Sequence, residues 1–164
     1  MIFETERLLI RKLNFNDLEG FHLLESDAKV LKYATGNVKN ITENEAELKG
    51  LISKYTMPNN NFWIYAAEIK KNNCFLGTVA LVKDGFDDEI GYRILQKYWG
   101  MGYGTELCAG LVNYCKDLNL KKIVGYVVNK NIASVRILRN LNFKKIKTFI
   151  NEENFVETKY QLEL

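Results

Sequence analysis

The residues that point most directly to chemistry form a glycine-spaced segment, Tyr98-Trp99-Gly100-Met101-Gly102-Tyr103-Gly104-Thr105. Glycines at alternate positions carry no Cβ atom, so a ligand can approach the backbone closely. The segment opens a predicted helix, whose first N–H groups lack intrahelical acceptors and whose dipole is positive at this end. These features predict a binding site for a diphosphate group.

Glycine-rich turns between a strand and a helix occur in several classes of protein, and two of these classes fit the chain poorly. A dinucleotide fingerprint opens the first βαβ unit and is followed about 20 residues later by an acidic residue. Here the turn follows a meander of three predicted strands, 62–69, 75–82 and 89–96, and segment 119–131 contains no acidic residue. A P-loop needs Gly-Lys-Ser/Thr, which the sequence lacks. Binding of an acyl carrier remains, as does a tight turn without a ligand.

Positive charge is concentrated in the second half of the chain. The net charge is only +3, yet residues 92–164 hold 12 basic and 6 acidic side chains, against 11 and 14 in residues 1–91. Segment 118–151 contains no carboxylate. This asymmetry favours contact with a polyanion, although a solvated lysine-rich face and nucleic-acid binding also fit.

Length and composition favour one domain over residues 1–164, with 47% hydrophobic and 26% charged residues. There is no long apolar run, and the first twelve residues carry several charges, so we expect no membrane span, no signal peptide and a cytoplasmic protein. The three cysteines occur singly and His22 is the only histidine. We therefore expect no metal site, no disulfide framework and no histidine-based nucleophile.

Hydrophobic periodicity predicts an α/β fold with a mixed sheet. We expect Asn14 to cap a first helix, Thr42 and Glu45 to form a capping box for a helix that ends near Tyr55, and the segment 26–40 to be rich in loops. Two further helices are expected at 103–118 and 131–141. Strands are expected at 7–13, 62–69, 75–82, 89–96, 122–128, 143–150 and 155–163.

The order of these elements predicts where a ligand binds. A strand, the glycine turn, a helix and a strand in succession form a right-handed crossover, so strands 89–96 and 122–128 should be parallel. The other strands should pair mostly antiparallel. If the two parallel strands separate at their carboxyl ends, they leave a slot beside the glycine turn.

Several short segments, taken in order, resemble the GNAT N-acetyltransferases, and within them the branch of RimJ/RimL-like ribosomal-protein N-terminal acetyltransferases. The resemblance implies a single acetyltransferase domain with a mostly antiparallel sheet of about seven strands, helices on both faces, and a parallel pair that splays at the cofactor site. The matching segments are Thr5-Glu6-Arg7-Leu8-Leu9-Ile10-Arg11, Leu76-Gly77-Thr78, Glu89-Ile90-Gly91-Tyr92, the glycine turn with Glu106, Asn131-Ile132-Ala133-Ser134 and Asn142-Phe143.

The resemblance also implies the activity, which is transfer of an acetyl group from acetyl-coenzyme A to a primary amine in a ternary complex, with no metal. The diphosphate would lie on the backbone of 100–105 and the pantetheine arm along the strand that ends at Leu95. The 3′-phosphate would lie near one of Lys130, Arg136 and Arg139. The implied cofactor-binding residues are Leu95, Trp99, Gly100, Met101, Gly102, Tyr103, Gly104, Thr105, Asn131 and Ser134.

Acetyl transfer needs a base, an oxyanion donor and a proton source. Glu89 is the candidate base, although it could instead end a solvated acidic run or attract a cationic acceptor. A backbone N–H near Leu95 is the candidate oxyanion donor. Ser134 is the candidate group for protonating the thiolate, unless it only caps its helix, and Asn131 either orients the cofactor or caps that helix.

Three positions depart from the pattern of the family. Leu138 stands where many members have a tyrosine that acts as general acid, so another group or water must act. Trp99 stands where many have arginine or glutamine, and Asn142 where glycine is usual, which asparagine's access to the left-handed region permits. Cys108 and Cys115 lie on the apolar stripe of the helix, so neither is placed as an acyl carrier.

The acceptor is not defined by the sequence. Tyr33, Trp63 and Tyr92 are candidates for the wall of its site, although aromatic residues of this kind are more often core. The resemblance favours a protein N-terminal α-amine, such as that of a ribosomal protein, and a homodimer; polyamines, amino sugars and amino acids stay open. Two rival functions are a noncatalytic coenzyme A sensor and a ribosome- or nucleic-acid-associated adaptor.

Overall fold

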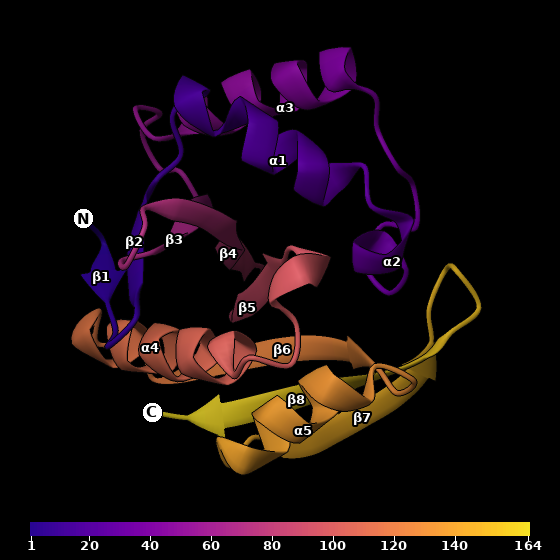
Figure 1. Cartoon of the computed structure of the whole chain (residues 1–164). Helices are drawn as coiled ribbons and strands as arrows, with labels where there is room; N and C mark the ends of the chain where they lie inside the picture. Colours follow the sequence, from indigo (N-terminus) through magenta and orange to yellow (C-terminus); the bar gives the residue numbers. More distant parts are fainter.

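The first half of the chain forms five consecutive antiparallel strands, which are β1 (Phe3–Glu4), β2 (Leu8–Lys12), β3 (Phe62–Ile69), β4 (Cys74–Asp84) and β5 (Asp87–Ile94). These elements belong to a computed structural model that describes residues 1–164, apart from the side chain of Asp84. Figure 1 shows the arrangement.

The second half begins with η2 (Gln96–Tyr98), the glycine turn and α4 (Tyr103–Asp117), and continues with β6 (Lys122–Val128), α5 (Ile132–Asn140), β7 (Lys144–Ile150) and β8 (Val156–Glu163). The sheet has eight strands in the order β1-β2-β3-β4-β5-β6-β8-β7. Among the strands that the structure describes, only β5 and β6 pair parallel. The predicted fold class is confirmed, and the two-residue β1 accounts for the strand beyond the expected seven.

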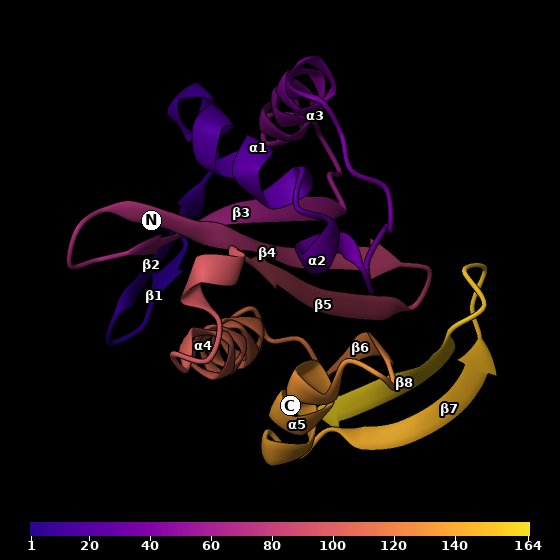
Figure 2. The ribbon, with the colours of Figure 1, turned by 45° about the vertical axis from the view of Figure 1, so that its right-hand side comes forward.

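Helices cover both faces of the sheet. η1 (Phe15–Asp17), α1 (Leu18–Glu25), α2 (Ala28–Leu31) and α3 (Ile41–Lys54) lie on one side, and α4 and α5 lie on the other, as Figure 2 shows. The larger core joins the sheet to α4 through residues such as Ile90, Ile94 and Leu107. A smaller cluster, which includes Phe21, Leu48 and Ala66, packs under α1 and α3.

Some predicted boundaries were wrong. α3 is capped by Asn40, whose Oδ1 accepts the N–H of Glu43 at 3.0 Å while Glu43 accepts the N–H of Asn40 at 2.8 Å. The expected capping box of Thr42 and Glu45 does not form, because the same spacing occurs two residues earlier and that one starts the helix. The segment 26–40 also contains the short helix α2. Asn14 caps η1 as expected.

The parallel strands separate soon after they meet. Their register contains one pair, Glu89 with Val124, and β5 then runs on without a partner on that side (Figure 2). On its other side β5 lies very close to β4. This approach is possible because Gly77 has no Cβ atom, which would clash with the carbonyl oxygen of Arg93. The backbones of β5 and β6 thus diverge toward their carboxyl ends, where the slot was predicted. No helix among the residues described is long and apolar enough to cross a membrane.

Candidate active site

The glycine turn leaves a row of backbone donors unpaired. Gly100 and Gly102 have φ values of 74° and 81°, in the left-handed region that glycine adopts without strain. The N–H of Glu106 donates to the carbonyl oxygen of Gly102 at 3.1 Å and closes the first turn of α4. Within the described part of the chain, the N–H groups of residues 100–105 donate to no protein acceptor. They lie at the positive end of a 15-residue helix, which suits an anion.

Arg7, from the connection between β1 and β2, braces this turn. Its Nη1 donates to the carbonyl oxygen of Met101 at 3.1 Å, and its guanidinium lies 4.3 Å from the ring centroid of Tyr103. Its Nε and backbone N–H donate to the Glu106 carboxylate at 2.5 and 2.7 Å. Burial raises the pKa of Glu106, but hydrogen bonds from Thr5 and Arg7 outweigh burial and leave that pKa below its usual value.

The brace was not predicted, because Arg7 lies far from the turn in sequence and its charge falls in the acidic half of the chain. The only signal in the sequence was the segment Thr5–Arg11, which resembles the family pattern but to which no function had been assigned.

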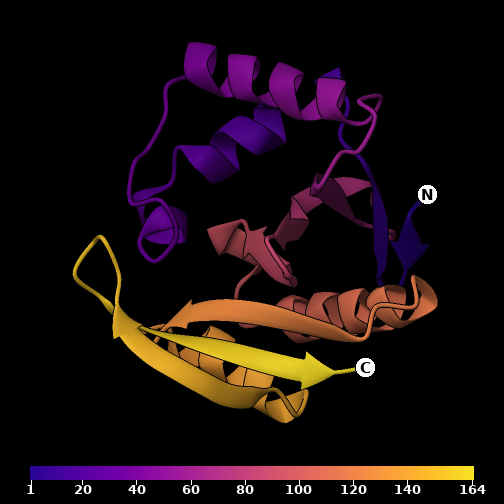
Figure 3. The same cartoon turned by 180° about the vertical axis from the view of Figure 1, so that it is seen from behind.

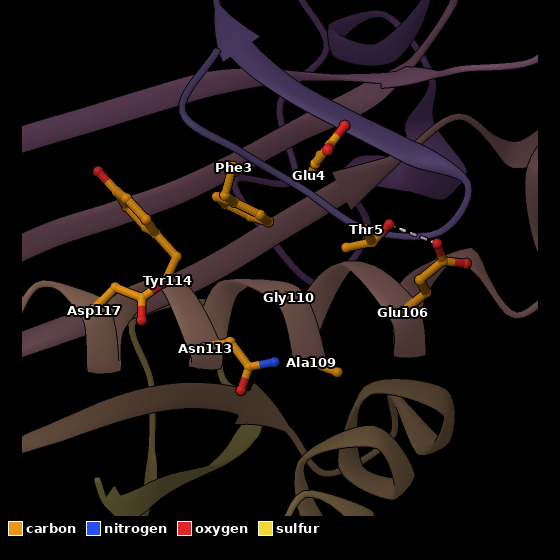
Figure 4. A pocket seen from close by; sticks show the side chains of 9 residues that line it. All are labelled: Phe3, Glu4, Thr5, Glu106, Ala109, Gly110, Asn113, Tyr114 and Asp117. Atoms are coloured by element: carbon orange, nitrogen blue, oxygen red, sulfur yellow. Dashed lines mark hydrogen bonds between the residues drawn. The ribbon is translucent and has the colours of Figure 1, made fainter.

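A groove of about 290 Å³ lies between β1 and α4, and Figure 4 shows the hydrogen bond between Thr5 and Glu106 at its end. It contains none of the predicted site residues; its lining is Phe3, Glu4, Thr5, Glu106, Ala109, Gly110, Asn113, Tyr114 and Asp117.

The end of β5 is fixed to the turn in two ways. The indole Nε1 of Trp99 donates to the carbonyl oxygen of Ile94 at 2.8 Å. The N–H of Leu95 donates to the carbonyl oxygen of Leu76 at 3.0 Å, so it is not free. The oxyanion donor that we expect near Leu95 is therefore not the N–H of Leu95 itself but one of its neighbours. Because N–H directions alternate along a strand, those of Tyr92 and Ile94 turn toward the diverging β6.

The two candidate catalytic residues lie on opposite faces of the sheet. Successive side chains alternate along β5, and its pairing with β4 has no bulge. Glu89 and Arg93 face α1, where Arg93 Nη1 binds the buried Glu25 carboxylate at 2.7 and 2.8 Å. Tyr92 faces α4, with its ring 3.6 Å from the Cβ position of Gly104. A group that reaches both Glu89 and Ser134 would have to pass between the diverging ends of β5 and β6.

Tyr92 and Ser134 form a contact that the sequence did not predict. Their hydroxyl oxygens are 3.0 Å apart. Burial raises the pKa of Tyr92 to about 12, although its bond to Ser134 acts in the opposite direction. The Asn131 side chain accepts the N–H of Ser134 at 3.3 Å, so Asn131 caps α5, one of the two roles expected for it. Leu138, one turn later, is buried against Gly125 and cannot donate a proton.

The structure does not bring the other two acceptor candidates to Tyr92. Tyr33 packs edge-on against Phe155, at 5.7 Å between centroids, where the loop after α2 meets the β7–β8 hairpin (Figures 1 and 3). Trp63 lies on β3, in a stack with Tyr55 and Tyr65, with β4 between it and β5. It borders a second groove, of about 200 Å³, near the end of α4.

The three cations that are candidates for contact with the 3′-phosphate are exposed around the start and the outer side of α5. They are Lys130, Arg136 and Arg139.

Cys108 and Cys115 are buried, and burial raises the pKa of each thiol to about 12. Asn142 has a φ value of 65°, in the left-handed region as expected. Among the described residues, no group of three or more His, Cys, Asp or Glu is placed to hold a metal ion.

Comparison with known proteins agrees with the fold. The sequence profile of the acetyltransferase (GNAT) domain family matches residues 7–144. The uncharacterized N-acetyltransferase YnaD of Bacillus subtilis is 27% identical over 148 residues, which cover 88% of this chain and 84% of that protein. A GNAT-family acetyltransferase structure from Bacillus anthracis superimposes with a TM-score of 0.87 at 22% identity, over 98% of this chain and 97% of the other.

The fold of the RimJ/RimL branch is also close. RimL, described as a ribosomal L7/L12 alpha-N-protein acetyltransferase in complex with coenzyme A, superimposes with a TM-score of 0.81 at 16% identity. The match covers 98% of this chain and 96% of that one. At this identity the likeness concerns the fold.

Proposed function

The chain belongs to the GNAT acetyltransferase family, and we propose that it transfers the acetyl group of acetyl-coenzyme A to the α-amino group of a protein N-terminus or to a similar primary amine. One observation carries the proposal. Unpaired backbone N–H groups at residues 100–105 lie beside the opening between β5 and β6.

The residues of the turn fit coenzyme A. Left-handed glycines leave no Cβ atom over the N–H groups, and a diphosphate is the kind of anion that such a helix start binds. Trp99, Gly100, Met101, Gly102, Tyr103, Gly104 and Thr105 would hold the diphosphate, and Leu95 and Asn131 would line the path of the pantetheine arm. Bound acetyl-coenzyme A would supply an acetyl thioester that an amine can attack.

The base and the thioester sulfur would lie on opposite faces of β5. The amine would arrive on the α1 face, where Glu89 would accept its proton, directly or through a water. The N–H groups of Tyr92 and Ile94 would donate to the carbonyl oxygen as negative charge develops there. Ser134, on the α4 face, would stabilise the sulfur as the carbon–sulfur bond breaks. Base and thioester would thus act from opposite sides without competing for space.

An N-terminal α-amine suits this arrangement better than a lysine side chain. Its reference pKa is about 7.7 to 8.0, against about 10.4 for lysine, so much more of it is neutral at pH 7. A single carboxylate such as Glu89 then has to deprotonate a smaller fraction of the amine. The fold likeness to RimL, whose description names an α-N-protein acceptor, supports the same choice. A polyamine or an amino acid would need a stronger base or a higher pH.

Two assays test the proposal together. Calorimetry should show that the protein binds coenzyme A and binds pantetheine, which lacks the diphosphate, much more weakly. A panel of short peptides with different first residues, with spermidine and free amino acids as alternatives, should show amine-dependent release of thiol. Binding without turnover on any amine would favour the noncatalytic sensor.

The adaptor alternative has a separate test. RNA binding that is tight and steeply dependent on salt would support it, since contacts to many phosphates release counterions. If the protein binds no coenzyme A, the proposed function is wrong.

A further inference from the structure

A hydrogen bond between two hydroxyl groups spans the opening beside the glycine turn. Tyr92 lies on β5, beyond the last residue that pairs with β6, and Ser134 lies in the first turn of α5, which follows β6. Their hydroxyl oxygens are 3.0 Å apart. The bond therefore joins the two sides of the slot where the strands have separated.

Its surroundings are largely apolar. The Tyr92 ring lies near the first turn of α4, and the Cβ position of Gly104 is 3.6 Å from Tyr92, 3.1 Å from Ile137 and 3.7 Å from Ile94. Leu138 is buried in the next turn of α5. Hydrogen bonds in such surroundings are stronger than in water, so the orientation of these hydroxyls is well determined.

The chemistry of the two groups sets the direction of the bond. A phenol is a stronger acid than an aliphatic alcohol, so Tyr92 is the better donor and Ser134 the better acceptor. Burial raises the pKa of Tyr92 to about 12, which keeps its proton in place at neutral pH. When Tyr92 donates to the Ser134 oxygen, the Ser134 proton is left free to point elsewhere.

We propose that Tyr92 is a positioning residue, which holds the Ser134 hydroxyl so that its proton points at the sulfur of coenzyme A. The inference rests on the proposed function. As the amine nitrogen bonds to the acetyl carbon, the carbon–sulfur bond breaks and its electron pair goes to sulfur. The amine proton passes to Glu89 and then to water, and the thiolate takes a proton from water after it leaves.

Neither hydroxyl gives up its proton in this step. Both groups are much weaker acids than a thiol, whose reference pKa is about 8.5, so a full transfer to the thiolate would run uphill. Ser134 instead stabilises the developing negative charge through a hydrogen bond, which Tyr92 strengthens by donating to the same oxygen. The pair thereby replaces the tyrosine that Leu138 excludes.

The test measures the thiol pKa of bound coenzyme A, followed by the ultraviolet absorbance of the thiolate with the protein alone subtracted. We expect this pKa to be about one unit lower in the wild-type complex than in free coenzyme A, as a hydrogen bond to the charged form requires. Tyr92→Phe and Ser134→Ala should each return it most of the way to the free value. The double variant should equal the single Ser134→Ala variant, because Tyr92 acts through Ser134.

Turnover and affinity provide the second readout. Both single variants should lose about tenfold in kcat, equivalent to 1.4 kcal/mol, with the coenzyme A affinity changed less than twofold. Tyr114→Phe, on the far part of α4, is the matched control and should change neither value. Ser134→Thr keeps a hydroxyl and should keep the lowered thiol pKa only when Tyr92 is present. Ser134→Thr and Ser134→Ala both retain Tyr92, so their comparison tests the hydroxyl that Tyr92 positions even if Tyr92→Phe folds poorly.

Two results would overturn the inference while the proposed function stands. The first is a wild-type thiol pKa that is lowered equally in Tyr92→Phe. The second is a Tyr92→Phe variant that loses affinity for coenzyme A but keeps its kcat, which would make Tyr92 a wall of the binding site. A wild-type protein that does not bind coenzyme A would contradict both proposals.

Discussion

Arg7 Nη1 donates a hydrogen bond to the carbonyl oxygen of Met101 at 3.1 Å, so the start of the chain holds the middle of the glycine turn. With the carbonyl of Met101 occupied by a cation, the neighbouring N–H groups stay available for an anion. The guanidinium is also fixed by Glu106 and by the ring of Tyr103. If the turn binds the cofactor as proposed, its binding should thus depend on a residue outside the glycine motif.

Arg7→Gln should weaken binding of coenzyme A more than it lowers stability. The side chain is 42% exposed, so the free energy of unfolding should fall by only about 0.2 to 1 kcal/mol. The dissociation constant should rise about tenfold, because the turn loses both its brace and a nearby positive charge. Calorimetry and thermal unfolding give the two values. Lys49→Gln, which removes a cation from α3, should change neither by more than a small margin.

Gly102→Ala, compared with a control glycine, should distinguish a loss of stability caused by backbone strain from a loss of coenzyme A affinity. At a φ of 81° an alanine costs about 1 to 2 kcal/mol, and its Cβ atom would lie 3.4 Å from Arg7 Nη2. Gly85→Ala is the matched control, since Gly85 has a φ of 58° with no atom within 4 Å of its Cβ position. We expect similar losses of stability in the two variants, and loss of coenzyme A affinity only at Gly102. Equal affinities would show that the turn does not bind the cofactor.

Glu89→Gln should lower kcat by about 100-fold or more and leave the coenzyme A affinity unchanged, if Glu89 is the base. The deficit should shrink as pH rises through the pKa of the acceptor amine, because a neutral amine needs less help. Initial rates across a pH series measure this. Glu152→Gln, in the β7–β8 turn, should behave like the wild type. An unaltered kcat in Glu89→Gln would remove this residue from the mechanism.

The thiols should react in an order set by burial. Cys108 and Cys115 are 1% and 0% exposed, and burial raises the pKa of each to about 12, whereas Cys74 is partly exposed. Iodoacetamide at pH 8 should therefore modify Cys74 alone in the folded protein and all three after unfolding. Peptide mass spectrometry identifies the sites. Modification of Cys108 in the folded protein, or its acetylation by acetyl-coenzyme A, would argue for a covalent carrier.

Much of the architecture followed from local patterns. The β6 strand matched its predicted range at 122–128, because an apolar run between the turn at Asn119 and the helix cap at Asn131 has few alternatives. The Thr42 capping box failed because two overlapping copies of the pattern occur in Asn40–Glu45, and Asn40 with Glu43 forms the box. Leu118 similarly fits the apolar stripe of α4, yet it follows the helix and is 45% exposed.

The site was less predictable than the fold. The glycine turn was evident because its chemistry is local, but its brace by Arg7 and the contact between Tyr92 and Ser134 join residues far apart in sequence. The face of β5 that Tyr92 occupies follows from the register of the whole sheet. The bond from Leu95 to Leu76 likewise depends on how far the β4–β5 ladder extends.

The backbone N–H groups of residues 100–105 are proposed to bind the diphosphate of coenzyme A, and amide NMR can observe each of these groups individually. In a titration of the isotope-labelled protein, the amide resonances of Gly100, Gly102 and Gly104 should shift strongly with coenzyme A and with adenosine diphosphate. They should shift little with pantetheine, which lacks the diphosphate. If coenzyme A leaves these amides unmoved while others shift, the cofactor lies elsewhere and the account is wrong.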